Sequence, residues 1–478
     1  MNIKVHLRSL SLVPLLIASQ LLVGCGTEEE VVVVEAAATR KPNVILIYTD
    51  DQGAVDINRY GAKDLVTPHM DALCDTGLRF TQFYAPSAIC SPSRAGLLTG
   101  YYPLRTGMLG NAPSLRGNSG MSTELVTIAE MMKRGGYATS HIGKWHLGYS
   151  KETMPNAQGF EHSFGHMSGC IDNYSHSFYS YGPNYHDLHR NGEDVHEEGR
   201  YFPDLMVEEA EGYIESHREQ PFFMYFAMNS PHYPVQGEPK WIKYYQDQGM
   251  AYPRDIYAAF VSSQDDRIGR LVAAVERFGL SEDTIIIFQS DHGHATTKSA
   301  HGGGGSAGPY RGAKKSLFEG GIRVPAMITW PGHIPAGAIR DQVAHGCDWM
   351  ATIAALCDVP LVNADIDGKS LVSVIEDAKA PTPHEVLHWE MGETDGKGWA
   401  VRKGDWKLLG LPIDTSKKGP LGEDDTLFLV NFAEDVSEME NLAGAYPDKV
   451  RELEKLHTDW DRGAREELGQ RGYPIFEK

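Results

Sequence analysis

The sequence predicts an α/β protein built on a largely parallel sheet, followed by a smaller antiparallel sheet. Four apolar runs rich in β-branched or aromatic residues are spaced along the chain, as expected of strands buried on both faces. Helical periodicity alternates with them, and polar residues follow their carboxyl ends. Because ligands of parallel sheets bind beyond the carboxyl ends of the strands, we expect these polar residues to meet in one crevice.

The first predicted strand covers residues 43–48 (NVILIY) and ends just before Asp50 and Asp51. A helix is expected over residues 125–134, where the apolar spacing is helical and two glycines follow. Residues 137–142 form the second strand, which leads into the segment GKWHLG.

Residues 222–228 (FFMYFAM) are the third predicted strand, leading into NSPHYP, and residues 284–288 (TIIIF) are the fourth. Beyond residue 377 the pattern changes to short alternating runs separated by turns, which predicts a small antiparallel sheet. Residues 448–467 are an expected amphipathic helix. We therefore expect a main domain at residues 42–377 and a C-terminal subdomain at residues 378–478.

Residues 1–24 predict an export signal. Lys4 and Arg8 precede an apolar run that is too short to span a membrane as a stable helix. The run ends in Leu-Val-Gly-Cys, which resembles a bacterial lipobox and implies cleavage before Cys25 and lipid attachment to its thiol. A plain signal peptide is the alternative. Both predict an exported protein, in the periplasm or at the cell surface, with residues 25–41 as a tether and no other link to a membrane.

The chain has 478 residues, a formal net charge of −20 and a pI near 5.4. No run of lysine or arginine interrupts this charge, so the global field repels polyanions and argues against nucleic acid as a partner. An anionic substrate therefore needs a local cationic pocket.

Four of the six cysteines raise the question of disulfides. Cys347 and Cys357 lie ten residues apart in a predicted helix, which separates them by about 15 Å at 1.5 Å per residue and puts a disulfide out of reach. We expect both to be reduced core residues. The sequence leaves open whether Cys74 and Cys170 pair.

The segment CSPSRAGLLTG, residues 90–100, is the most informative in the chain. A thiol at Cys90 can be oxidised to an aldehyde, formylglycine, whose hydrate supplies a nucleophilic oxygen with Arg94 nearby to hold its charge. The alternative is a buried cysteine and a surface arginine. The segment resembles the signature of the type I, formylglycine-dependent sulfatases, Cys-x-Pro-Ser-Arg followed by Leu-Thr-Gly, and the resemblance continues through GYYPLRTG to Gly107.

This resemblance implies that Cys90 is converted by a formylglycine-generating maturation enzyme. It also implies an alkaline-phosphatase-like fold, in which residues 42–377 are the catalytic domain.

Three carboxylates follow two of the predicted strands: Asp50, Asp51 and Asp291. Unpaired anions in one crevice repel each other, so a bound divalent cation is expected. The alternative is that each aspartate has only a local role, because an aspartate after a strand is typical of a turn or a helix N-cap. In sulfatases, segments like YTDDQG and SDHG bind calcium together with the modified cysteine, which implies Ca²⁺ here with Cys90 among its ligands. His292 matches a position that is asparagine in many members and histidine in others. Calcium prefers oxygen ligands, so an imidazole at this position leaves the identity of the metal open.

Lys144 and His146 alternate about a tryptophan in GKWHLG, which places both on one side of an extended segment. The same element in sulfatases implies that Lys144 contacts the sulfate and His146 the formylglycine hydrate. His232 in NSPHYP matches the Pro-His-x-Pro element, which implies a general acid near the leaving oxygen. Counting back from FEGGIRVP places Lys314 on the sulfate-binding lysine, although Lys315 stands where the family often has glycine.

The function implied is hydrolysis of a sulfate ester. The predicted export favours a sulfated carbohydrate as the substrate, and an aryl sulfate is the alternative. One oxygen of the hydrated aldehyde attacks sulfur while His232 protonates the leaving alcohol; sulfate is then held covalently until His146 takes a proton and the aldehyde reforms. Two alternatives are a phosphodiester or phosphonate ester hydrolase of the same superfamily and an inactive lipoprotein that binds sulfated glycans. Residues 174–201, rich in tyrosine and histidine, are where substrate contacts are expected, with a surface insertion as the alternative.

Overall fold

The computed structural model describes residues 40–180, 182–392, 398–422 and 424–476. Residues from Arg40 onward form one compact unit. The predicted export signal, Cys25 and most of the predicted tether lie outside the described residues. Within the described ranges, no helix combines the length and the apolar character needed to cross a membrane.

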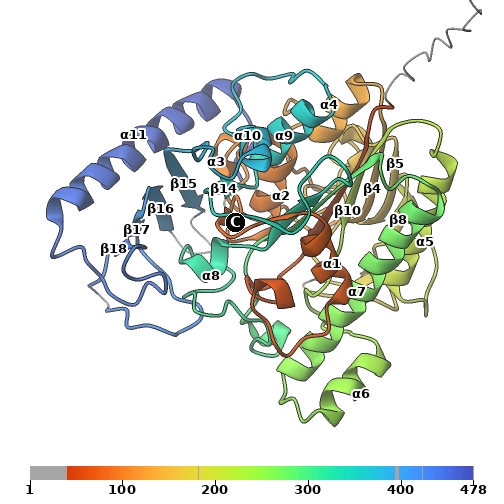
Figure 1. Ribbon diagram of the computed structural model, residues 1–478, viewed down its shortest axis with the longest axis horizontal. Coiled ribbons are helices and arrows are strands. Elements are labelled where there is room, and N and C mark those ends of the chain that lie inside the picture. Colours follow the sequence, from red (N-terminus) through yellow and green to blue (C-terminus); the bar gives the residue numbers. More distant parts are fainter. Residues whose placement is uncertain (1–39, 181, 393–397, 423, 477–478) are drawn as a thin grey trace, which may run out of the picture. The chain divides into compact units, whose positions relative to one another are not determined.

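A ten-stranded mixed sheet runs through this unit (Figure 1). The strand order is β13-β2-β12-β11-β1-β10-β4-β5-β8-β9. The neighbours β11, β1, β10, β4 and β5 are parallel, and antiparallel pairs extend the sheet on both sides. In chain order the strands are β1 (Asn43–Thr49), β2 (Leu78–Phe80), β4 (Ala138–Lys144), β5 (His162–His166), β8 (His189–Arg190), β9 (Glu193–Asp194), β10 (Phe222–Ala227), β11 (Thr284–Ser290), β12 (Ala326–Thr329) and β13 (Ala338–Arg340).

Strand β1 shows why the centre of the sheet is continuously apolar. Its side chains alternate between two cores: Val44, Leu46 and Tyr48 face one, and Ile45 and Ile47 face the other. A strand covered by helices on both faces gains from an apolar residue at every position. The four predicted strands correspond to β1, β4, β10 and β11, so the predicted parallel sheet is confirmed.

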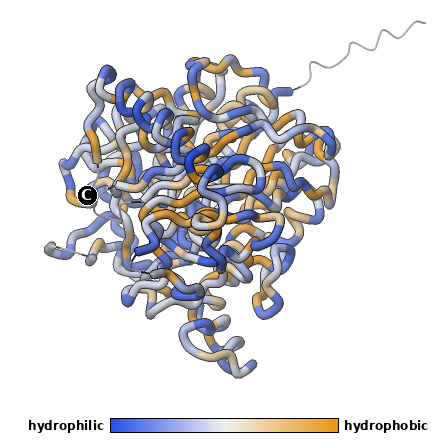
Figure 2. The backbone as a smooth tube through the Cα atoms, turned by 90° about the vertical axis from the view of Figure 1, so that its left-hand side faces the viewer, coloured by the Kyte–Doolittle hydropathy of each residue, from blue (hydrophilic) through white to orange (hydrophobic). Residues whose placement is uncertain are grey.

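Helices cover both faces of the sheet (Figure 1). Apolar segments of the tube run through the interior in Figure 2, and hydrophilic segments lie mainly outside. The helices that contribute most to the first core are α2 (Cys90–Thr99), α4 (Ile128–Arg134) and α9 (Asp348–Leu356), and those in the second are α1 (Pro68–Thr76), α5 (Phe202–Ser216) and α7 (Arg254–Arg277). Shorter or peripheral helices are α3 (Pro103–Thr106), α6 (Pro239–Asp247), α8 (Glu319–Ile322) and α10 (Val372–Glu376).

Helix α4 begins three residues later than predicted. Thr127 accepts a hydrogen bond from the Glu130 amide, and the Glu130 carboxylate accepts one from the Thr127 amide. This capping box satisfies backbone donors at the first turn and fixes the helix start, which apolar spacing alone does not reveal.

The predicted C-terminal sheet and helix are confirmed. Four antiparallel strands in sequence order are β15 (Val386–Met391), β16 (Gly398–Lys403), β17 (Trp406–Gly410) and β18 (Leu427–Asn431). Helix α11 (Pro447–Arg471) packs against β16 and β17 (Figure 1). A buried ion-pair network ties this sheet to α8, because the Lys407 ammonium lies 3.0 Å from both the Glu319 and Glu438 carboxylates.

The cysteines of the described residues are all free and buried. Cys347 and Cys357 flank helix α9 as its N-cap and C-cap, so the prediction that they are reduced core residues is confirmed. Cys74 lies beside the sulfur of Met327, and Cys170 lines the cavity described below. Cys74 and Cys170 therefore form no disulfide.

Candidate active site

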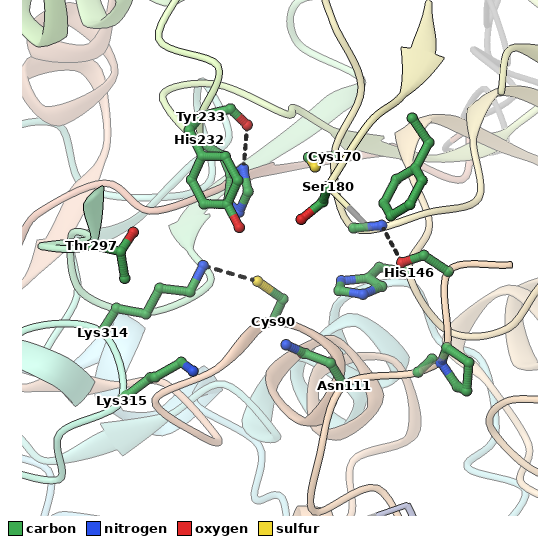
Figure 3. A pocket seen from close by; sticks show the side chains of 15 residues that line it. Cys90, Asn111, His146, Cys170, Ser180, His232, Tyr233, Thr297, Lys314 and Lys315 are labelled. Carbon is green, nitrogen blue, oxygen red and sulfur yellow. Dashed lines mark hydrogen bonds between the residues drawn. The ribbon is translucent and has the colours of Figure 1, made fainter. Parts of the chain in front are cut away.

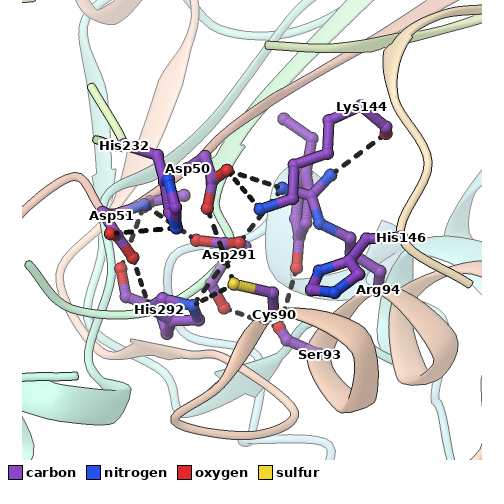
Figure 4. A network of polar contacts seen from close by, with 12 residues as sticks. Asp50, Asp51, Cys90, Ser93, Arg94, Lys144, His146, His232, Asp291 and His292 are labelled. Atoms are coloured by element: carbon purple, nitrogen blue, oxygen red, sulfur yellow. Dashed lines mark hydrogen bonds and ion pairs between the residues drawn. The ribbon is translucent and has the colours of Figure 1, made fainter. Parts of the chain in front are cut away.

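Cys90 is the first residue of helix α2 and lies beyond the carboxyl ends of the central strands. Its sulfur is 3.4 Å from Lys314 Nζ (Figure 3). It is also 3.4 Å from His292 Nε2 and 3.7 Å from Asp50 Oδ1 (Figure 4). Burial alone would raise the pKa of the thiol, but Lys144, Lys314 and His292 together hold it well below its usual value. The surroundings of Cys90 therefore favour negative charge at this position.

The predicted cation ligands come together around Cys90. Asp50 and Asp51 follow β1, Asp291 follows β11, and these two strands are hydrogen-bonded neighbours. The Asp51 amide donates to Asp291 Oδ1 at 3.1 Å, and the His292 ring nitrogens lie 3.5 Å from carboxylate oxygens of Asp51 and Asp291. Ligand atoms of Asp50, Cys90, Asp291 and His292 all lie within 4.8 Å of one another.

The charges of this cluster fit a divalent cation. Burial raises the pKa of Asp291 to about 8, reinforced by Asp50 and Cys90 and opposed by His292 and Arg94. Burial would also raise the pKa of Asp50, but Lys144, 2.5 Å away, acts with His232 and Arg94 to bring that pKa well below its usual range. Asp51 Oδ2 is buried with no hydrogen-bond partner among the described residues. Clustered carboxylates with an unsatisfied oxygen are what a hard cation coordinates.

Arg94 lies one helical turn after Cys90 and is fully buried. Its guanidinium is 3.1 Å from Asp291 Oδ2 and 3.7 Å from Asp50 Oδ2, and it also contacts the Tyr225 hydroxyl at 3.3 Å. Arg94 thus lies against two of the carboxylates that surround Cys90. The permanent positive charge of its guanidinium offsets part of the negative charge of these carboxylates.

His146 follows β4 in a left-handed conformation, with φ of 55°. Its carbonyl accepts a 2.6 Å hydrogen bond from the Ser91 hydroxyl, which ties it to the residue after Cys90. A Cβ atom at Gly169 would come within 2.8 Å of the His146 ring, so only glycine fits there. Burial lowers the pKa of His146 to about 4, which leaves a neutral imidazole able to accept a proton.

His232 lies in the loop after β10. Its Nδ1 donates to the Tyr233 carbonyl at 2.7 Å, because a carbonyl can only accept. The other ring nitrogen, Nε2, lies 3.7 Å from Asp51 Oδ2 at the base of the cavity. Nε2 therefore faces the site beside this carboxylate, too far from it for a hydrogen bond.

The adjacent lysines take different positions. Lys314 Nζ lies 2.7 Å from Asp51 Oδ1 and 3.4 Å from the Cys90 sulfur. Lys315 has φ of 72°, its amide donates to the Ala88 carbonyl at 2.9 Å, and its side chain belongs to the cavity wall. Lys314, which the motif predicts to bind sulfate, is thus in contact with Cys90.

A cavity of about 450 Å³ opens above Cys90 (Figure 3). Phe178 and Ser180 belong to residues 174–201, so this segment does reach the cavity, as expected of a substrate-contacting segment. The full lining consists of Cys90, Asn111, Ala112, Pro113, Ser114, His146, Gly169, Cys170, Phe178, Ser180, His232, Tyr233, Thr297, Lys314 and Lys315.

Several polar residues of this wall were not predicted: Asn111, Ser114, Tyr233 and Thr297. Asn111 also accepts a 3.0 Å hydrogen bond from the Ser91 amide and so satisfies a donor in the first turn of α2. Of these four residues, only Tyr233 could have been recognised from the sequence, because it directly follows His232 in the chain. The others are single polar residues in loops, with no motif around them.

The fold and the site define a hydrolase of the alkaline-phosphatase-like class, with a buried cysteine among carboxylates and lysines. The chain matches the family model described as Sulfatase over residues 42–359 and the one described as N-sulphoglucosamine sulphohydrolase, C-terminal, over residues 310–458. It therefore belongs to the sulfatase family of the alkaline-phosphatase-like superfamily, and it is an enzyme that hydrolyses sulfate esters.

Curated relatives agree with this assignment over most of the chain. Arylsulfatase A of Bos taurus is 31% identical, and the alignment covers 89% of this chain and 89% of that protein. N-acetylgalactosamine-6-O-sulfatase of Bacteroides thetaiotaomicron is 30% identical, with 93% of this chain and 98% of that protein covered.

Solved structures agree on the fold. The protein Ps i-CgsB, crystallised with k-i-k-neocarrahexaose, is 29% identical, has a TM-score of 0.78, and is covered over 94% of its chain and 89% of this one. Phosphonate monoester hydrolase of Agrobacterium radiobacter has a TM-score of 0.60 at 19% identity, with 96% of that chain and 87% of this one covered, and shares the fold alone.

Proposed function

We propose that this sulfatase removes sulfate from a sulfated carbohydrate. Two relatives support the proposal: one is named N-acetylgalactosamine-6-O-sulfatase and one was crystallised with a neocarrahexaose. The cavity adds support, because hydroxyl and amide groups of Ser114, Ser180, Thr297 and Asn111 line it beside the ring of Tyr233. Polar groups next to an aromatic ring are suited to a sugar, which carries many hydroxyls and apolar ring faces.

The proposed nucleophile is formylglycine derived from Cys90. A maturation enzyme would oxidise the thiol-bearing carbon to an aldehyde with loss of the sulfur, consuming an external oxidant, and hydration of the aldehyde supplies a nucleophilic oxygen at this position. The contacts of Cys90 support this role, since Lys314 Nζ and His292 Nε2 both lie 3.4 Å from its sulfur. Positive groups at this distance would stabilise an oxyanion in the same place.

Asp50, Asp51, Asp291 and His292 are the proposed ligands of a calcium ion, together with the modified Cys90. When bound, the cation would supply Lewis acid stabilisation of negative charge beside the nucleophile. The fit is supported by the buried Asp51 Oδ2, which has no hydrogen-bond partner in the described part of the chain.

The remaining side chains have two proposed tasks: the lysines neutralise charge on the sulfate, and the histidines transfer protons. Lys144 and Lys314 neutralise the non-bridging oxygens of the sulfate. His232 gives its Nε2 proton to the leaving alcohol oxygen, and Asp51 Oδ2 lies 3.7 Å from that nitrogen. Neutral His146 accepts the proton that must leave the nucleophile before the aldehyde reforms. The two histidines suit opposite roles because burial favours the neutral ring of His146, whereas a carboxylate faces that of His232.

One observation carries the proposal: the position of Cys90 between the Lys314 ammonium and the carboxylate cluster, at the base of a polar cavity. The test is free sulfate released from a panel of sulfated oligosaccharides and an aryl sulfate, with calcium present. Peptide mass spectrometry must first find the aldehyde at residue 90. Release from a glycan establishes a carbohydrate sulfatase and identifies the sugar.

Release from the aryl sulfate alone would reject the carbohydrate substrate while leaving the catalytic assignment intact. Failure on every sulfate ester, with hydrolysis of a phosphonate or phosphate ester, would reject sulfate as the preferred anion. The shared fold of the phosphonate monoester hydrolase makes that second measurement necessary.

We also propose export with a lipid anchor at Cys25, on the sequence pattern alone. Metabolic labelling with a radioactive fatty acid should label the natural chain, and Cys25→Ala should abolish the label. A labelled Cys25→Ala chain would reject the anchor.

A further inference from the structure

A second group of metal-ligating side chains lies outside the active site. His186 is the last residue of β7 (Tyr185–His186), and His196 and Glu198 follow β9. One ligand atom from each residue lies within 4.8 Å of the others. None of the three belongs to the cavity above Cys90.

The hydrogen bonds of His186 orient its ring toward this group. Its Nε2 lies 2.7 Å from the Val195 carbonyl oxygen, and because a carbonyl only accepts, Nε2 carries the proton. Nδ1 of a neutral His186 is then a bare lone pair, 3.7 Å from Glu198 Oε1. A backbone hydrogen bond that fixes the outer nitrogen is the usual support of a metal-bound histidine.

His196 contacts the same Glu198 oxygen. Its Nδ1 lies 2.9 Å from Glu198 Oε1, and its ring stacks on that of His186 with centroids 4.4 Å apart. Ligands about 2.0–2.2 Å from a tetrahedral zinc ion are about 3.3 Å from each other. The two nitrogen–oxygen distances, 2.9 and 3.7 Å, fall on either side of that value.

The ligand types select the metal. Imidazole nitrogen suits zinc and other late transition metals, whereas calcium takes six to eight oxygen ligands. The side chains of His196 and Glu198 are 64% and 53% exposed, so an ion can enter from solvent and water can complete its coordination. From this geometry we propose that His186, His196 and Glu198 form a zinc site.

The site would brace one wall of the active-site cavity. Strand β7 pairs with β6 (Ser177–Phe178), with His186 opposite Ser177 and Tyr185 opposite Phe178. Phe178 lines the cavity above Cys90. An ion bound at His186 therefore restrains the hairpin that carries Phe178. The zinc site itself does not depend on the proposed substrate.

The test is the number of zinc ions bound per chain, measured on the full protein after removal of transition metals and with saturating calcium. Because Cys90 and His292 can also hold zinc, the decisive quantity is the difference between variants. The natural chain should bind one more zinc ion than His196→Ala. His333→Ala, which removes an exposed histidine elsewhere, should match the natural chain.

Two further measurements make the result specific. Glu198→Gln keeps the size of the side chain but removes its charge, and should weaken zinc binding at the site by more than about 10-fold. Hydrogen exchange followed by mass spectrometry should show that zinc protects residues 177–198 in the natural chain and in His333→Ala, but not in His196→Ala. Equal zinc content in the natural chain and His196→Ala, or equal protection of residues 177–198 in both, would overturn the proposal.

Discussion

The Lys314 ammonium lies 3.4 Å from the Cys90 sulfur and 2.7 Å from Asp51 Oδ1. Burial would lower the pKa of Lys314, but Asp51 and Cys90 outweigh it and raise that pKa well above its usual value. Lys314 therefore carries a permanent charge beside the Cys90 sulfur. An anion bound at the proposed nucleophile would meet this charge already in place, so little reorganisation would be needed.

Lys314→Ala should lower kcat by about 10²–10³-fold, the usual effect of losing one group that stabilises a developing anion. Lys315→Ala is the matched control, because Lys315 is the neighbouring lysine on the cavity wall and has no described contact with Cys90. It should change KM more than kcat, with kcat within about 10-fold of the natural value. Steady-state release of sulfate measures both. An equal loss of kcat in the two variants would refute the assignment of Lys314.

Cys90→Ala should reduce sulfate release by about 10⁴-fold or more, since alanine lacks the thiol that the maturation enzyme oxidises to the aldehyde. The fold should survive, because the change removes one buried atom at the start of a helix that is buried throughout. Near-natural circular dichroism together with lost activity is the expected pair of results. An active Cys90→Ala protein would exclude the formylglycine nucleophile.

His232→Ala should affect substrates according to their leaving group. A sugar alkoxide needs a proton to depart, so turnover of a carbohydrate sulfate should fall by about 10²–10⁴-fold. A nitrophenolate leaves without help, and turnover of nitrophenyl sulfate should fall much less. The comparison of the two substrates on one variant cancels any effect on folding. An equal loss with both substrates would assign His232 to binding instead of proton transfer.

Removal of calcium with a chelator should abolish activity, and added calcium should restore it. Asp51→Asn should weaken the apparent calcium affinity by on the order of 100-fold, because it removes one of the three carboxylates whose charge attracts the ion. Activity measured against free calcium concentration gives this shift. Unchanged activity in the chelator-treated protein would contradict the proposed cation.

Acid should destabilise the fold partly through His141, a buried residue of β4 whose ring packs against Trp145, Phe160 and Tyr225. Burial lowers the pKa of His141 to about 3, whereas the unfolded chain takes up a proton near pH 6.5. The free energy of unfolding is therefore not reduced by His141 above about pH 6.5. Between pH 6.5 and about 3 it falls by up to about 1.4 kcal/mol per pH unit.

His141→Phe should reduce the loss in the free energy of unfolding between pH 7 and pH 5 by about 2 kcal/mol. Urea titrations at the two pH values measure it, with the exposed His333→Ala as the control. The same loss in His141→Phe and the natural chain would show that His141 does not titrate on unfolding.

The central strands were predictable because a strand covered on both faces must be apolar along its whole length, as β1 is. The two-residue strands β6 to β9 were not predicted, since pairs such as Ser177–Phe178 and Tyr185–His186 have too few residues to show a period. The start of α4 was also missed. It depends on two hydrogen bonds between Thr127 and Glu130, which the apolar spacing does not encode.

The sequence by itself determined the chemistry of this protein. The residue types and spacings around Cys90 named the family, and the polar residues after β1, β4, β10 and β11 indicated one shared crevice. Only the tertiary structure decided which groups meet there. Register between β1 and β11 places Asp51 against Asp291, and the left-handed turn at Lys315 separates it from Lys314. Contacts between residues more than two hundred positions apart depend on strand pairing, and strand pairing is a property of the whole fold.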